Sequence, residues 1–88
     1  SLVGIDEIDR LDNIKLFPNP ATDHLQISID GITNENIRIV LFDIEGKIVF
    51  ENFLNENGII NVSSIPRGMY IIKLENDNRT FYRKVFLN

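Results

Sequence analysis

The stretch IRIVLFDIEGKIVF (residues 37–50) decides the fold, because it reads as two strands joined by a tight turn. Both faces of its first half, IRIVLF, are largely apolar, which predicts a central strand that is covered on both sides. Gly46 stands where a short hairpin loop needs a positive φ. We therefore expect Phe42 and Lys47 to flank a type I turn with a glycine bulge, and a further strand to follow over residues 47–53.

Outward from this hairpin, apolar residues recur at every second position in several further segments. A period of two is typical of strands with one buried face. The segments cover residues 14–16, 25–29, 60–62, 70–74 and 81–87. Short strands at this close spacing, separated by turn residues, predict an all-β protein with the architecture of an Ig-like antiparallel β-sandwich of about seven short strands.

Two further turns are predicted from residue types. The tripeptide PRG, residues 66–68, offers Pro at the second and Gly at the fourth position of a type I turn. The tripeptide NDN, residues 76–78, contains side chains that tolerate a left-handed backbone, so it is expected to close the last hairpin.

Two prolines one residue apart, Pro18 and Pro20, precede the strand that starts near His24. Proline fixes φ near −65° and removes a backbone donor, and Asn19 is driven toward extended geometry because it precedes a proline. The segment can stay extended but cannot pair as a central strand. We expect it to end the first strand and protect an edge, where the chain bends from one sheet toward the other.

Composition narrows the classes of protein. With 88 residues the chain is long enough for one compact domain with a small core. Its net charge of −4 repels nucleic acid and anionic lipid, so neither is an expected partner. The chain has no cysteine, which excludes a disulfide framework and a thiolate metal site. No apolar run reaches the roughly 20 residues of a membrane-spanning helix.

The first twelve residues differ from the rest. Residues 1–12 combine dense acidic charge with isolated aliphatic residues and Gly4, which indicates a linker to an upstream cargo domain. The spacing of Ile5, Ile8 and Leu11 leaves a short helix open. Residues 13–88 form the predicted domain, and Asn88 is expected to be the C-terminus of a longer parent protein.

Candidate catalytic and metal-binding groups each have a plainer interpretation. His24 is the single histidine, and at the start of a strand it is expected to be a surface residue. Asp43 and Glu45 could form a carboxylate pair, yet both fall in a hairpin loop, where Asp commonly bonds its own backbone. The Asp and Asn residues lack the spacing of a calcium loop. We therefore expect no enzymatic activity, no cofactor, no metal site and no small-molecule substrate.

Four sequence blocks together resemble a known family. They are FPNPATDHLQI from Phe17, VLFDIEGKIV from Val40, IPRGMYIIKL from Ile65 and RKVFLN from Arg83. In this order and spacing they are similar to the C-terminal sorting domain of the type IX secretion system of Bacteroidetes. The resemblance covers residues 14–88.

The resemblance implies which residues belong to recognition motifs. They are Phe17, Pro18, Asn19, Pro20, Ala21, Asp43, Gly46, Lys47, Pro66, Gly68, Tyr70, Lys73, Lys84 and Val85. Three positions depart from the family pattern: Phe17 replaces a more frequent Tyr, Met69 replaces Val or Ile, and Asn88 stands where members often have a basic end. Tyr70 is also expected to be a core aromatic whose hydroxyl finds a partner at the rim.

The resemblance implies a non-catalytic domain that serves as an export signal, or address, for an attached protein. A cargo protein in the periplasm would present this domain to an outer-membrane translocon, cross the membrane, and lose the domain to a sortase that cuts within residues 1–15. The cargo would then be secreted or held at the cell surface. From the charges we further expect Lys73, Arg83 and Lys84 to form an exposed basic patch that takes part in recognition.

Two alternatives stay open from the residues alone. An Ig-like module of a secreted enzyme could bind carbohydrate or protein, although the chain has no Trp and most of its aromatic residues share parity with aliphatic ones. Edge-mediated homodimerisation is the other, because strongly strand-forming segments can pair at any exposed sheet edge.

Overall fold

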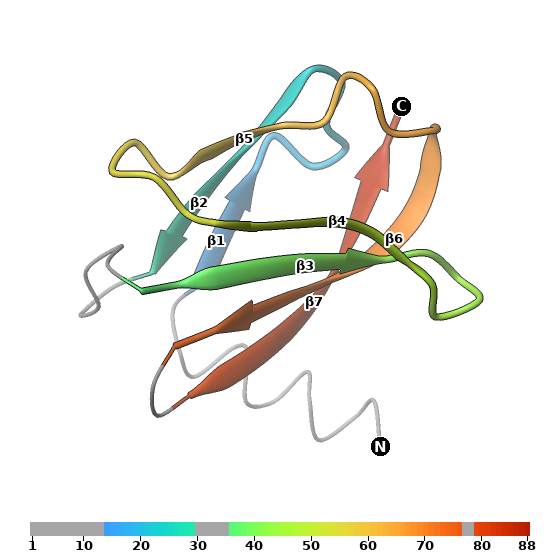
Figure 1. Cartoon of the computed structure of the whole chain (residues 1–88). Coiled ribbons are helices and arrows are strands. Elements are labelled where there is room, and N and C mark those ends of the chain that lie inside the picture. The colour runs from blue at the N-terminus through green and yellow to red at the C-terminus, as the bar shows by residue number, and fades with distance from the viewer. Residues whose placement is uncertain (1–13, 30–35, 77–78) are drawn as a thin grey trace.

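The computed structural model describes residues 14–29, 36–76 and 79–88. These residues form seven strands and no helix, as Figure 1 shows. The strands are β1 (Ile14–Phe17), β2 (His24–Ile29), β3 (Arg38–Phe42), β4 (Ile48–Phe53), β5 (Ile59–Asn61), β6 (Gly68–Glu75) and β7 (Thr80–Leu87). The prediction of an all-β protein with about seven short strands is confirmed.

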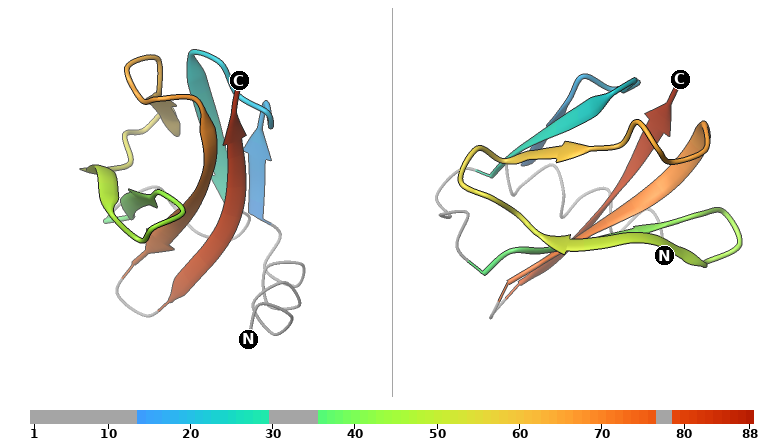
Figure 2. Two further views of the ribbon diagram at one scale, coloured as in Figure 1. Left: turned by 90° about the vertical axis from the view of Figure 1, so that its right-hand side faces the viewer. Right: turned by 45° about the horizontal axis from the view of Figure 1, so that its top comes forward.

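The strands form two antiparallel sheets. One sheet has the order β1-β2-β5, and the other has the order β4-β3-β6-β7. The two further views in Figure 2 show these sheets as separate layers. Each sheet alone has one apolar face, and packing the two faces together buries both, which is the physical basis of a sandwich.

The core lies between the sheets and follows the predicted alternation. Leu25 of β2, Leu41 of β3, Ile72 of β6 and Val85 of β7 are fully buried and belong to one hydrophobic cluster. Burying a side chain of this size stabilises the fold by roughly 1.5–3 kcal/mol relative to leaving it in water. Because the cluster draws on both sheets, it is the main force that holds the layers together.

Strand β3 is interior to its sheet, as its apolar sequence predicts. It pairs with β4 on one side and with β6 on the other. Val40 points away from the core cluster but is only 2% exposed. Its cross-strand neighbours are Glu51 and Lys73, whose aliphatic stems can cover an apolar neighbour while their charges stay in water.

The turn between β3 and β4 confirms the predicted chemistry. Gly46 has φ of 86°, and its N–H donates to the Asp43 carbonyl at 2.9 Å, as in a type I turn followed by a glycine bulge. Asp43 and Lys47 close the loop, because the Asp43 N–H donates to the Lys47 carbonyl. The prediction had Phe42 in the place of Asp43. A register shift beyond Leu41 accounts for this change, because it places Phe42 opposite Ile48.

The connection between β5 and β6 differs from the prediction. The hydrogen-bonded turn runs from Val62 to Ile65, whose N–H donates to the Val62 carbonyl at 3.1 Å. The Ile65 carbonyl, which a turn over PRG would use, instead accepts from the Arg67 guanidinium. The tripeptide therefore forms a bend without its own turn hydrogen bond. Gly68 still needs to be glycine, because its φ of 148° is one that L side chains rarely adopt.

Some predictions fall on parts of the chain outside the described residues. The expected linker, residues 1–12, lies there, and so do residues 77–78 of the last turn. The flanks of that turn are described: the Asn76 N–H donates to the Arg79 carbonyl, and the Asn76 Oδ1 accepts from the Arg79 N–H, both at 2.9 Å. The described part of the chain holds no helix with the length and hydrophobicity that a membrane crossing requires.

Candidate functional site

Part of each of the four sequence blocks lies at one end of the sandwich. The connection between β1 and β2, the turn between β3 and β4, the connection between β5 and β6, and the end of β7 all lie at this end. In Figure 1 it occupies the top and right of the molecule. We call it the motif end and define it by residues 18–23, 43–47 and 62–67 together with Asn88.

Asn19 joins the first block to the last. The prolines on either side of it have no N–H to donate to a neighbouring strand. The Asn19 side chain bonds to the open edge of β7 in their place: its Oδ1 accepts from the Phe86 N–H at 3.1 Å, and its Nδ2 donates to the Lys84 carbonyl at 3.5 Å. The peptide bonds before Pro18 and Pro20 are both cis.

Ala21 continues this contact with its backbone. Its N–H donates to the Phe86 carbonyl, and its carbonyl accepts from the Asn88 N–H, both at 2.8 Å. The result is a short parallel bridge opposite Leu87, with Ala21 fully buried. Residues 18–21, which we call the strap, thus leave the three-stranded sheet and cover part of the edge of the four-stranded sheet. This confirms that the two prolines end the first strand where the chain crosses toward the other sheet, but residues 18–20 form bends and do not stay extended as expected.

Arg67 is the hub of the motif end, and sequence reasoning missed it. Its Nη1 donates to the Thr22 carbonyl at 2.6 Å and to the Asn88 carbonyl at 3.3 Å. Its Nη2 donates to the carbonyls of Val62 and Ile65, each at 2.5 Å. One guanidinium, which has five donors in a fixed plane, therefore ties three segments together. A cation between Pro and Gly was the only available signal in the sequence.

Tyr70 is buried as predicted, with 5% of its surface exposed. Its hydroxyl donates to the Pro66 carbonyl at 2.5 Å. The ring therefore packs in the core, and its polar end fixes the loop that carries Arg67. Pro66 and Tyr70, two residues of the third block, are thus joined by this hydrogen bond, which ties the connection between β5 and β6 to the core.

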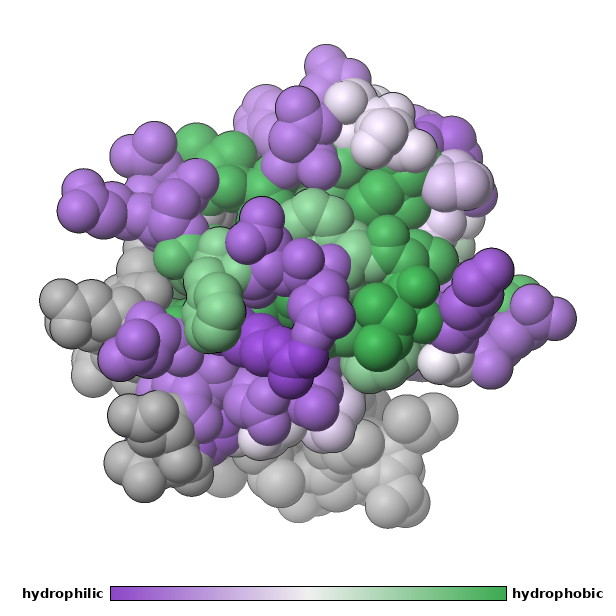
Figure 3. All heavy atoms as spheres, in the orientation of Figure 1, coloured by the Kyte–Doolittle hydropathy of each residue, from purple (hydrophilic) through white to green (hydrophobic). Residues whose placement is uncertain are grey.

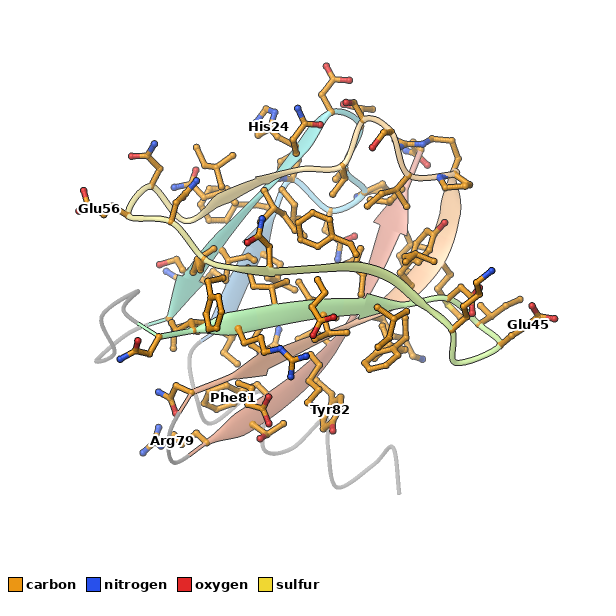
Figure 4. All side chains as sticks on the ribbon, in the orientation of Figure 1. His24, Glu45, Glu56, Arg79, Phe81 and Tyr82 are labelled. Atoms are coloured by element: carbon orange, nitrogen blue, oxygen red, sulfur yellow. The ribbon has the colours of Figure 1, made fainter. Side chains whose placement is uncertain are left out.

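The Asp43 carboxylate accepts hydrogen bonds from the backbone of its own loop. Oδ1 accepts from the backbone N–H groups of Glu45 and Lys47, both at 2.9 Å. This arrangement confirms the interpretation of Asp43 as a turn residue, and it leaves Glu45 exposed at the tip of the hairpin, as labelled in Figure 4.

The expected basic patch is wrong in its geometry. Lys73 lies opposite Tyr82, and Lys84 lies opposite Ile71, all on the outer face of the four-stranded sheet. Arg83 lies opposite the fully buried Ile72, on the face that turns toward the core, and is itself half-buried. The reason is the period of two, which places adjacent residues of β7 on opposite faces.

The described residues, 14–29, 36–76 and 79–88, contain no group of three or more His, Asp and Glu side chains that could hold a metal ion. His24 lies exposed at the start of β2, where Figure 4 labels it. What these residues do offer is a surface at the motif end, built from loops that the strap, Arg67 and Tyr70 hold in place.

Comparison with known proteins gives two kinds of match. A family model described as a secretion system C-terminal sorting domain matches residues 15–88. The chain is 34% identical over 82 residues to Ulvan lyase NLR42 of Nonlabens ulvanivorans, an alignment that covers 90% of this chain and 15% of that protein. It is 31% identical over 74 residues to an endo-acting ulvan lyase of Formosa agariphila, covering 82% of this chain and 14% of that protein. The chain therefore corresponds to a small part of each relative.

Proposed function

Because the chain belongs to the family of secretion system C-terminal sorting domains, we propose that it is a non-catalytic address that directs an attached cargo across the outer membrane through the type IX secretion system. The observation that carries this proposal is the family match over residues 15–88, together with the presence of part of each sequence block at the motif end. A surface composed of every block is a suitable target for a receptor that must distinguish this domain from other sandwiches.

The direction of the first strand supports this reading. β1 starts at Ile14 on the opposite end of the sandwich and runs toward the motif end. An upstream cargo would therefore connect at the end remote from the motif end. A receptor that binds the motif end would meet no obstruction from the cargo at that point.

We extend the proposal to the partners and the route. The cargo passes through the periplasm, the translocon takes it across the outer membrane, and a sortase then removes the domain by cutting within residues 1–15. The product is released or kept at the cell surface. The relatives are named ulvan lyases, so the proposed cargo is a secreted enzyme of the polysaccharide-degrading kind.

A carbohydrate-binding module is less well supported. Phe17, Phe53 and Phe86 are exposed, with 45%, 64% and 45% of their surface accessible. Phe17 lies on the outer face of the three-stranded sheet, whereas the other two lie on the outer face of the four-stranded sheet, at opposite ends. They do not form the shared flat platform on which a sugar chain would stack.

Export of a reporter tests the proposal. A fluorescent protein with a periplasmic signal peptide is fused upstream of residues 1–88 and expressed in a host with a type IX system and in the same host without its translocon. We expect fluorescence in the medium or on the cell surface only in the first host. Equal export in both hosts, or retention of the fusion in the periplasm of the first, would contradict the proposal.

A matched pair of variants locates the address. Lys47→Gln changes an exposed residue of the motif end, and Lys15→Gln changes an exposed residue near the start of β1 at the other end. Both remove one positive charge from an exposed position. If the motif end is read, the first variant lowers export more than the second.

A further inference from the structure

The outer face of the four-stranded sheet divides into two halves with different chemistry. The half remote from the motif end carries charges that pair with one another: Arg38 contacts Glu51 and lies 3.6 Å from Glu75, and Lys73 lies 3.8 Å from Glu75. These side chains lie around Val40 and leave it only 2% exposed. In this half of the sheet, the sheet's own charged side chains cover Val40, so no third layer is needed there.

The half next to the motif end is apolar, and among the described residues no strand lies over it. We call it the outer apolar patch, and its members are Phe42, Ile48, Met69, Ile71 and Phe86. The strand register makes it continuous, because Phe42 lies opposite both Ile48 and Ile71, and Met69 lies opposite Phe86. Ile48, Phe86 and Met69 have 50%, 45% and 38% of their surface exposed. Figure 3 shows this apolar surface between the charged residues at the centre and the hairpin that projects at the right.

The charges at the edge of the patch are mainly basic. Lys84 lies opposite Ile71 and is exposed, and Lys47 precedes Ile48 and is exposed as well. Glu45, at the tip of the hairpin, is the acidic residue nearest to Lys47 in sequence. A complementary surface would therefore present apolar side chains flanked by carboxylates.

We propose that the outer apolar patch is a docking surface for a protein of the export machinery that presents an apolar face with a rim of carboxylates. This inference rests on the proposed function and deepens it, because it assigns the binding energy to one sheet face beside the motif end. Exposed Phe, Met and Ile side chains on a rigid sheet are typical of the core of a protein interface, and two lysines fit its rim. A chain with a net charge of −4 is poorly suited to an anionic membrane surface.

A matched pair of double variants tests the patch in the reporter fusion. The patch variant is Met69→Thr with Phe86→Thr, and the control is Phe53→Thr with Ile59→Thr. The control residues are 64% and 38% exposed and lie outside the patch, so both variants remove exposed apolar surface and introduce a strand-forming residue. Thermal unfolding of the purified chains shows whether each variant folds as the parent does.

We expect the patch variant to lower export by about tenfold or more while the control stays close to the parent, since loss of central interface residues weakens binding by that order. Reversal of the rim charges, Lys47→Glu with Lys84→Glu, should lower export further than Lys47→Gln with Lys84→Gln. Export of a folded patch variant at the level of the parent would refute the inference while leaving the proposed function intact. A parent fusion that is not exported would instead refute the proposed function.

Two other occupants of the patch are tested with the purified chain. Binding to vesicles of phosphatidylglycerol and phosphatidylcholine that is lost in the patch variant would overturn the inference in favour of a lipid surface. A parent chain that is dimeric by light scattering, with a monomeric patch variant, would overturn it in favour of a second copy. A monomeric parent that does not bind vesicles supports a protein partner.

Discussion

Replacing Arg67 with Gln is expected to destabilise the whole sandwich, although the residue lies in a surface loop. Its guanidinium donates five hydrogen bonds to backbone carbonyls of three segments. Those to Val62 and Ile65 are partly buried, while those to Thr22 and Asn88 are exposed and count for less. Gln is too short and has too few donors to replace them.

The magnitude follows from the shielded contacts. A hydrogen bond from a charged group contributes about 1.5–3 kcal/mol when it is shielded from water. Two bonds at the lower end of this range, reduced by about 1 kcal/mol for the side-chain entropy that ordering an Arg costs, leave a net loss of about 2 kcal/mol. For a domain of this size, that corresponds to a fall in Tm of roughly 10 °C.

Thermal and urea unfolding of the purified 88-residue chain, followed by circular dichroism, measures this loss. Lys15→Gln is the control, since it removes one positive charge from an exposed strand position. Arg67→Lys keeps the positive charge but loses the planar guanidinium. A Lys ammonium cannot donate to all of the same carbonyls at once, so this variant should recover less than half of the lost stability. If Arg67→Gln unfolds within about 0.5 kcal/mol of the parent, the hub is not a stabilising element and the reasoning is wrong.

Three further predictions test other parts of the fold. Gly46→Ala forces a side chain into φ of 86° where no atom crowds a Cβ, so pure backbone strain should cost about 1–2 kcal/mol in urea unfolding; an unchanged midpoint would exclude that strain. Leu41→Ala opens a cavity at a fully buried position and should cost about 2–5 kcal/mol in the same measurement, while a loss below 1 kcal/mol would mean that the core collapses around it. Asn52→Val removes the side-chain oxygen that accepts the Phe53 N–H at 2.8 Å on the edge strand β4, and should promote self-association that light scattering detects as a concentration-dependent mass; a strictly monomeric variant would show that this edge is protected otherwise.

The sequence allowed the strands to be predicted because the period of two is a local property. The alternation in β2, β6 and β7 marks which side chains face the core, and Gly46 marks the hairpin loop because the turn requires a positive φ there. The same alternation also places Arg83 on the core-facing side of β7. The prediction of a basic patch was wrong because it considered the charge of Arg83 and not the face of β7 on which Arg83 lies.

The contacts of the motif end could not be predicted from the sequence, because they join segments far apart in it. Arg67 and Thr22 are 45 residues apart, and Asn19 and Phe86 are 67 apart. Periodicity tells which face a residue occupies, but it does not tell which strands pair or which loops become neighbours. The order β4-β3-β6-β7 and the strap on β7 are decided by packing of the whole chain.

The strap has a consequence for the order of events during synthesis. A ribosome adds Asn19 67 residues before Phe86, its hydrogen-bond partner on β7. Translation that stops before Phe86 therefore yields a polypeptide in which the strap lacks its partners on β7. In the proposed function the cargo lies upstream, so it has been completely translated before the strap can close on β7, and a closed strap marks a chain whose cargo is already made.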